Sequence, residues 1–124
     1  MKFKAEVIFM GQINDDVMVN ILASSKALCF VSIFEGFGLP IVEAMKCHVP
    51  VITSNTSAMP EIAGNAALLV NPHNIHDISN AMCNIDNNPK LCKELIQKGE
   101  QIVQKFQWDN TAHTINEVLL KYAK

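Results

Sequence analysis

The sequence has little charge and no basic patch. Charged residues make up 18% of the 124 residues, the formal net charge is −2, and the basic side chains are scattered, with one local concentration from Lys90 to Lys98. Binding along the phosphates of a nucleic acid needs clustered cationic side chains. We therefore expect no nucleic-acid partner.

Signals for secretion, membrane insertion and metal binding are also lacking. No basic start is followed by an apolar stretch with a small-residue cleavage site, and no apolar run approaches the roughly 18 residues of a membrane span. The cysteines, Cys29, Cys47, Cys83 and Cys92, form no C-x-x-C pair and match no zinc spacing. We expect reduced cysteines, no metal, no cofactor and a cytoplasmic location; peripheral attachment to a membrane stays open.

Apolar runs alternate with helical patterns along the whole chain, which is 49% hydrophobic and contains no repeat or linker. Strands are predicted at 7–10, 27–32, 51–53 and 67–70. Helices are predicted after a cap at Asn14 or Asp15 and over 39–47, 60–63, 75–85, 89–106 and 110–122, the last three capped by Asn74, Asn88 and Asp109. The order predicts an α/β fold with a partial Rossmann-like parallel sheet of about four strands flanked by helices, in one domain over 1–124.

The segment between the second strand and the following helix has the strongest chemical pattern. It reads Glu35-Gly36-Phe37-Gly38-Leu39-Pro40-Ile41-Val42-Glu43. Glycines let the backbone turn sharply and leave amide groups open to a ligand, while proline suits the first turn of a helix. A strand, a glycine turn and a helix N-terminus together favour bound anions, most often phosphate.

The motif resembles the C-terminal donor-binding domain of retaining GT-B glycosyltransferases, the large group that includes sucrose, glycogen and mannosyl transferases. The resemblance covers essentially the whole chain. Its matching segments are Phe9-Met10-Gly11, Ser32 to Pro40, Glu43-Ala44-Met45, Pro50-Val51-Ile52, Pro60 to Gly64, Leu69 to Pro72, and Trp108 after Phe106.

The resemblance implies a role for each motif residue. Glu35 would accept hydrogen bonds from hydroxyls of a nucleotide-bound sugar and act in catalysis, either covalently or by stabilising a cation-like transition state. The amides of Gly36, Phe37, Gly38 and Leu39 would meet sugar or diphosphate oxygens, and Glu43 would hold the ribose. The donor would be a UDP- or GDP-sugar, transferred with retention and without a metal.

Several features depart from the family pattern. His48 stands where glycine is common, which could alter the turn, and Val31 replaces a common proline. The family's Arg and Lys for the diphosphate, its acceptor domain and its first two sheet strands have no counterpart. The strand at 27–32 would then have a bare edge, so we predict self-association there or direct pairing with the strand at 7–10.

Three functions follow as alternatives. The chain could be a fragment of a glycosyltransferase that binds donor and is inactive alone, or one chain of a split enzyme whose partner supplies the missing half. It could also be an interaction or structural module that kept the fold and lost donor binding.

Overall fold

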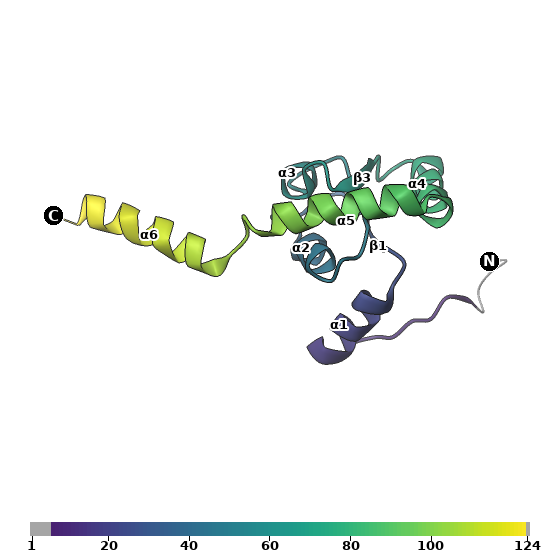
Figure 1. Ribbon diagram of the computed structural model, residues 1–124, viewed down its shortest axis with the longest axis horizontal. Helices are drawn as coiled ribbons and strands as arrows, with labels where there is room; N and C mark the ends of the chain where they lie inside the picture. The colour runs from purple at the N-terminus through teal and green to yellow at the C-terminus, as the bar shows by residue number, and fades with distance from the viewer. Residues whose placement is uncertain (1–5, 124) are drawn as a thin grey trace.

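A parallel three-stranded sheet forms the centre of the protein. The computed structural model describes residues 6–123, and its strands β1 (Leu28–Phe30), β2 (Val51–Ser54) and β3 (Ala67–Val70) lie in the order β1-β2-β3. Helix α2 (Leu39–Lys46) connects β1 to β2, and α3 (Met59–Ala63) connects β2 to β3 (Figure 1). The parallel pairing and the helical crossovers confirm the α/β prediction.

Helices cover both faces of the sheet. Val51 of β2 belongs to a core cluster with residues of α2 and α3, whereas the next residue, Ile52, belongs to a second cluster with residues of α4 (Ile75–Asn87). Helix α5 (Pro89–Val103) contributes Leu95 to one cluster and Ile102 to the other. Every residue of β2 is buried, as expected for a central strand whose two faces are both covered.

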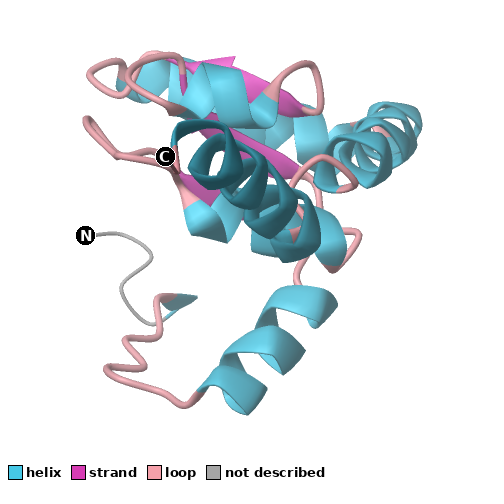
Figure 2. Cartoon of the chain, turned by 90° about the vertical axis from the view of Figure 1, so that its left-hand side faces the viewer, coloured by secondary structure: helices cyan, strands magenta, loops and turns pink. Residues whose placement is uncertain are grey.

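The first and last helices lie outside this core. Helix α1 (Asp15–Ser24) buries only Leu22 against it. Helix α6 (Trp108–Tyr122) buries none of its residues and points away from the sheet in Figure 1. Figure 2 is drawn from that side, with the C-terminus toward the viewer. Within residues 6–123, no helix is both long enough and apolar enough to cross a membrane.

The predicted strand at 7–10 is wrong. These residues form no strand, and Ile8 and Phe9 are 82% and 89% exposed. An apolar run forms a strand only where its backbone groups pair with a neighbouring strand, and within residues 6–123 this run pairs with none, although the outer edge of β1 is open. The predicted direct pairing of this run with β1 is therefore also wrong, while β1 lies at the edge of the sheet as expected. Self-association through that edge stays a prediction.

Most predicted helix starts are confirmed by their caps. The Asn14 side chain accepts the amide of Val17 at 2.9 Å, and Asn74 and Asn88 cap α4 and α5 in the same way. The cap of α6 is Gln107 instead of Asp109, which lies in the first turn, where its charge suits the helix dipole.

Candidate functional site

Residues 31–38, called the motif loop from here on, connect β1 to α2. They lie at the carboxyl end of a parallel strand, where α/β proteins bind ligands. Gly38 begins α2 in the left-handed conformation, with φ at 97°. A Cβ atom on Gly38 would also lie 3.1 Å from Cδ1 of Ile41. The fold itself therefore requires glycine at this position.

Gly36 is different, because the fold does not require it. Its φ is not positive, and a Cβ atom built on it would meet no atom within 4 Å. The conformational freedom predicted for both glycines is thus used at Gly38 alone. At Gly36 the absent side chain leaves open space beside the backbone.

Backbone amides without a hydrogen-bond acceptor in residues 6–123 follow one another along this loop. Within residues 6–123, the amides of Gly36, Phe37, Gly38 and Leu39 donate no hydrogen bond to the chain. The first amides of a helix have no intrahelical partner, and they form the positive end of its dipole. The loop can therefore accept an anionic or hydroxyl-rich ligand through its backbone.

The Glu35 side chain is half-buried and held at one oxygen. Ser32 Oγ donates to Glu35 Oε1 at 2.9 Å. Oε2 makes no hydrogen bond within the described part of the chain. An ionised carboxylate is an acceptor only, so the second oxygen is available to ligand hydroxyl groups.

Hydroxyl groups from β2 and the loop after it hold the motif loop in place. Thr53 Oγ1 donates to the carbonyl of Phe30 at 2.8 Å, and Ser54 donates to the carbonyl of Ser32. Thr56 Oγ1 donates to the carbonyl of Ile33 at 3.1 Å. Sequence analysis missed these residues, although the run of Ser and Thr after a buried strand was a visible signal.

Ser57 completes this set by contacting Glu35 itself. Its hydroxyl accepts the Glu35 amide hydrogen at 3.2 Å and donates to the Glu35 carbonyl at 2.7 Å. Both backbone groups of the predicted site residue are therefore bound by a side chain 22 positions away.

Glu43 lies on α2 and lines a groove of about 490 Å³ together with Pro40. The other walls come from the segment before α1, which includes Met10, from α1, from the segment after it, which includes Ala27, and from β1. Glu35 is not among the lining residues. The structure thus places Glu35 in the loop before α2 and Glu43 on α2 itself, and the two glutamates do not line the same groove.

Phe37 has a packing role. Its ring meets Phe106, which follows α5, in an edge-to-face contact with centroids 5.5 Å apart. Such a contact fixes the ring of Phe37 and anchors the middle of the motif loop to the end of α5.

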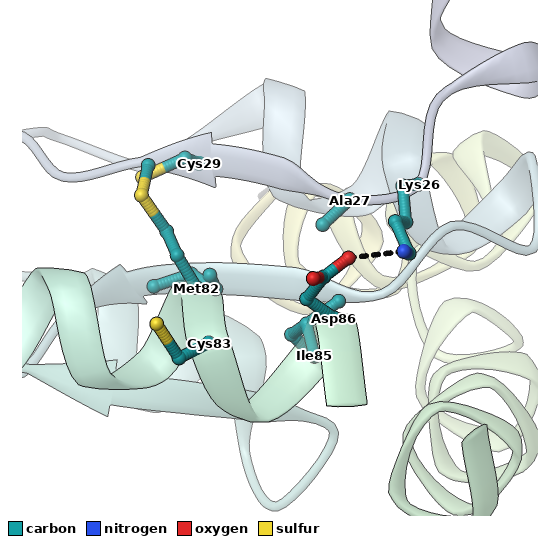
Figure 3. A pocket seen from close by; sticks show the side chains of 8 residues that line it. Lys26, Ala27, Cys29, Met82, Cys83, Ile85 and Asp86 are labelled. Carbon is teal, nitrogen blue, oxygen red and sulfur yellow. Dashed lines mark hydrogen bonds and ion pairs between the residues drawn. The ribbon is translucent and has the colours of Figure 1, made fainter. Parts of the chain in front are cut away.

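A second groove of about 400 Å³ lies on the α4 face of β1 (Figure 3). Met82 reaches from α4 toward Cys29 on β1, and Lys26 pairs with Asp86 at one end. Burial raises the pKa of the Cys29 thiol. No motif residue lines this groove, and the described residues hold no cluster of three His, Cys, Asp or Glu side chains that could bind a metal.

His48, at a position where glycine is common in the family, has a glycine-like backbone conformation. Its φ is 57°, the left-handed conformation that glycine adopts readily. Its Nδ1 lies 3.0 Å from Oε1 of Glu100 on α5. The histidine side chain therefore reaches α5 from a left-handed backbone position.

Known proteins are similar to this chain in sequence and in fold. Residues 1–102 match the model of the family described as glycosyl transferases group 1. The chain is 33% identical over 109 residues to the O-antigen chain mannosyltransferase B of Escherichia coli, covering 87% of this chain and 29% of that protein. It is 36% identical over 112 residues to the serotype-specific mannosyltransferase WbdA of Escherichia coli, covering 89% of this chain and 14% of that protein.

The structure resembles sucrose-phosphate synthase from Thermosynechococcus elongatus, with a TM-score of 0.84 and 27% identity. The match covers 97% of this chain and 31% of that one, so the chain spans less than a third of these relatives. The fold is accordingly a GT-B, Rossmann-like one. On the family match over residues 1–102, the chain belongs to the glycosyl transferases group 1 family.

Proposed function

We propose that residues 1–124 are part of the donor-binding domain of a glycosyltransferase and bind a nucleotide sugar of the UDP or GDP class. The observation behind this proposal is the set of unpartnered amides from Gly36 to Leu39 beside a carboxylate with one free oxygen. Amides at a helix N-terminus suit diphosphate or sugar oxygens.

The two carboxylates suit different parts of such a donor. Glu35 offers its free oxygen to hydroxyls of the donor sugar, beside the amides of the same loop. Glu43 is on the wall of the neighbouring groove, where the vicinal hydroxyls of a ribose suit an acceptor-only group. A carboxylate placed directly on the diphosphate would repel it, which favours this division.

In the complete protein, we propose transfer of the sugar with retention, and Glu35 as the catalytic residue. Its contribution is either covalent or the stabilisation of a cation-like transition state. The relatives named as mannosyltransferases and as a sucrose-phosphate synthase make a hexose the first donor sugar to test.

We propose that the chain alone binds donor without transferring it. All ten residues counted as Lys or Arg are lysines, and none of those within residues 6–123 lines the groove beside Glu43. Cations that stabilise the leaving diphosphate and groups that orient the acceptor are each worth orders of magnitude in rate. The remainder of a longer protein, or a partner chain, would supply them.

Calorimetric titration of the 124-residue chain with UDP, GDP, UDP-glucose and GDP-mannose tests the proposal. We expect saturable binding of one nucleotide class, lost in Glu43→Ala and kept in the control Glu94→Ala, an exposed glutamate on α5. No heat from any of the four ligands at millimolar concentration would contradict donor binding.

A second candidate function is an interaction or structural module, favoured by the exposed apolar surface of α6 and the exposed edge of β1. Trp108 and Leu120 on α6 are 83% and 70% exposed. Strand edges without a partner favour pairing with another chain, including a second copy. Light scattering separates the two: a concentration-dependent dimer without ligand binding supports the module, and a monomer that binds donor contradicts it.

A further inference from the structure

Ser57 adopts a backbone conformation that serine rarely takes. Its φ is 55°, in the left-handed region, and it belongs to no helix or strand. Only His48 shares this feature among the non-glycine residues that the structure describes. Glycine would adopt this conformation without strain, so the serine side chain must contribute something that glycine cannot.

That contribution is the pair of hydrogen bonds to Glu35. One hydroxyl accepts the Glu35 amide hydrogen at 3.2 Å and donates to the Glu35 carbonyl at 2.7 Å. Thr56 and Ser54 hold Ile33 and Ser32, but neither contacts Glu35. Ser57 therefore fixes the peptide groups on both sides of the residue whose carboxylate faces the ligand.

The carboxylate orientation depends on this backbone hold. Ser32 Oγ binds Glu35 Oε1 at 2.9 Å, and this contact requires the two residues, which are three positions apart, to keep their spacing across the loop. Ser57 holds one end of that span, and Ser54 holds the other through the carbonyl of Ser32. The free oxygen of Glu35 is thereby preorganised before any ligand arrives.

We propose that Ser57 is a positioning residue that presents Glu35 to the sugar of the donor. The proposal rests on the donor-binding function above. Because Ser57 acts through Glu35, it should affect the affinity for a nucleotide sugar and leave the affinity for the matching nucleoside diphosphate unchanged. A purely structural role would change both affinities together.

Ser57→Gly is the decisive variant, since it removes the hydroxyl at a φ that glycine tolerates. We expect its urea midpoint to match or exceed that of the unaltered chain. We expect amide hydrogen exchange at Glu35, measured by NMR without ligand, to be about tenfold faster. Affinity for GDP-mannose or UDP-glucose, whichever the chain binds, should fall about three- to tenfold, with GDP or UDP affinity unchanged.

Thr114→Val is the matched control, because it removes a hydroxyl on α6 that donates to the carbonyl of Asn110 and lies outside the motif loop. We expect normal exchange at Glu35 and a normal ratio of nucleotide-sugar to diphosphate affinity in this control. Unchanged exchange at Glu35 in Ser57→Gly would overturn the proposal, and so would an equal loss of both affinities. If the unaltered chain binds no ligand, the proposed function fails instead, and the ligand-free exchange comparison still decides whether Ser57 holds Glu35.

Discussion

Replacing Gly36 by alanine should separate the stability of the fold from ligand binding. The φ of Gly36 is not positive, and a Cβ atom there would meet nothing within 4 Å. Alanine also restricts the unfolded chain, which stabilises compatible sites by about 0.4–1 kcal/mol. We therefore expect the free energy of unfolding of Gly36→Ala, measured in urea, to stay within about 1 kcal/mol of the unaltered value.

The same methyl group should weaken donor binding strongly. It would occupy the open space beside the amides of Gly36 to Leu39, where we place sugar or diphosphate oxygens. A lost hydrogen bond to a charged group costs about 1.5–3 kcal/mol, which corresponds to a loss of affinity of roughly tenfold or more. Calorimetric titration with the nucleotide sugar measures this loss of affinity. Unchanged affinity in a stable Gly36→Ala protein would refute our placement of the ligand.

Gly38→Ala is the matched comparison, because it should damage the fold. At φ 97° an alanine pays the cost of a left-handed conformation, about 1–2 kcal/mol, and its Cβ would press on Ile41 at 3.1 Å. We expect a lower urea midpoint at unchanged slope. A Gly38→Ala protein as stable as Gly36→Ala would contradict the distinction drawn between the two glycines.

Three further predictions concern regions away from the motif loop. His48→Gly should raise the free energy of unfolding in urea by up to about 1 kcal/mol, because the strain relieved at φ 57° exceeds the small contribution of the exposed His48–Glu100 pair. A destabilised variant would show that this pair contributes more than the strain costs. Asn88→Ala should cost about 1 kcal/mol through loss of the α5 cap, whereas Asn84→Ala, on an exposed position of α4, should be neutral in the same assay. Iodoacetamide at pH 8, followed by mass spectrometry, should label Cys29 more slowly than Cys83, although both residues are exposed. Burial raises the pKa of Cys29 above its usual 9.0 and reduces its thiolate, so labelling of Cys29 at least as fast would contradict this.

The local signals in the sequence predicted the helices and the buried strands well. The caps at Asn74 and Asn88 are short-range effects, since the side chain binds an amide two or three residues away. The strand predicted at 51–53 was recognisable because apolar Val51 and Ile52 follow the proline that ends the preceding helical pattern. By contrast, the run at 7–10 is entirely apolar and yet forms no strand, because strand pairing depends on distant residues that no local pattern reveals.

In the candidate site too, features set by adjacent residues were predicted and contacts between distant segments were not. The motif located the loop, the helix start and both glutamates, because these depend on adjacent residues. The contact between Ser57 and Glu35 joins two loops 22 positions apart, so a pattern of neighbouring residues could not predict it. The left-handed conformation of Ser57 was equally hidden, since serine gives no signal for positive φ.

The geometry of the motif loop depends on β2, the strand that pairs with β1, and on the residues after it. Each hydroxyl that holds the loop comes from β2 or from the residues after it, namely Thr53, Ser54, Thr56 and Ser57. The outer edge of β1 contributes none of these bonds among the described residues. The donor contacts that we propose for Glu35 and its neighbouring amides would therefore need only β1, β2 and the loops that follow them, whereas the proposed transfer would also need cations and an acceptor site. Our proposal therefore treats donor binding and sugar transfer as separable steps and assigns only binding to the residues of this chain.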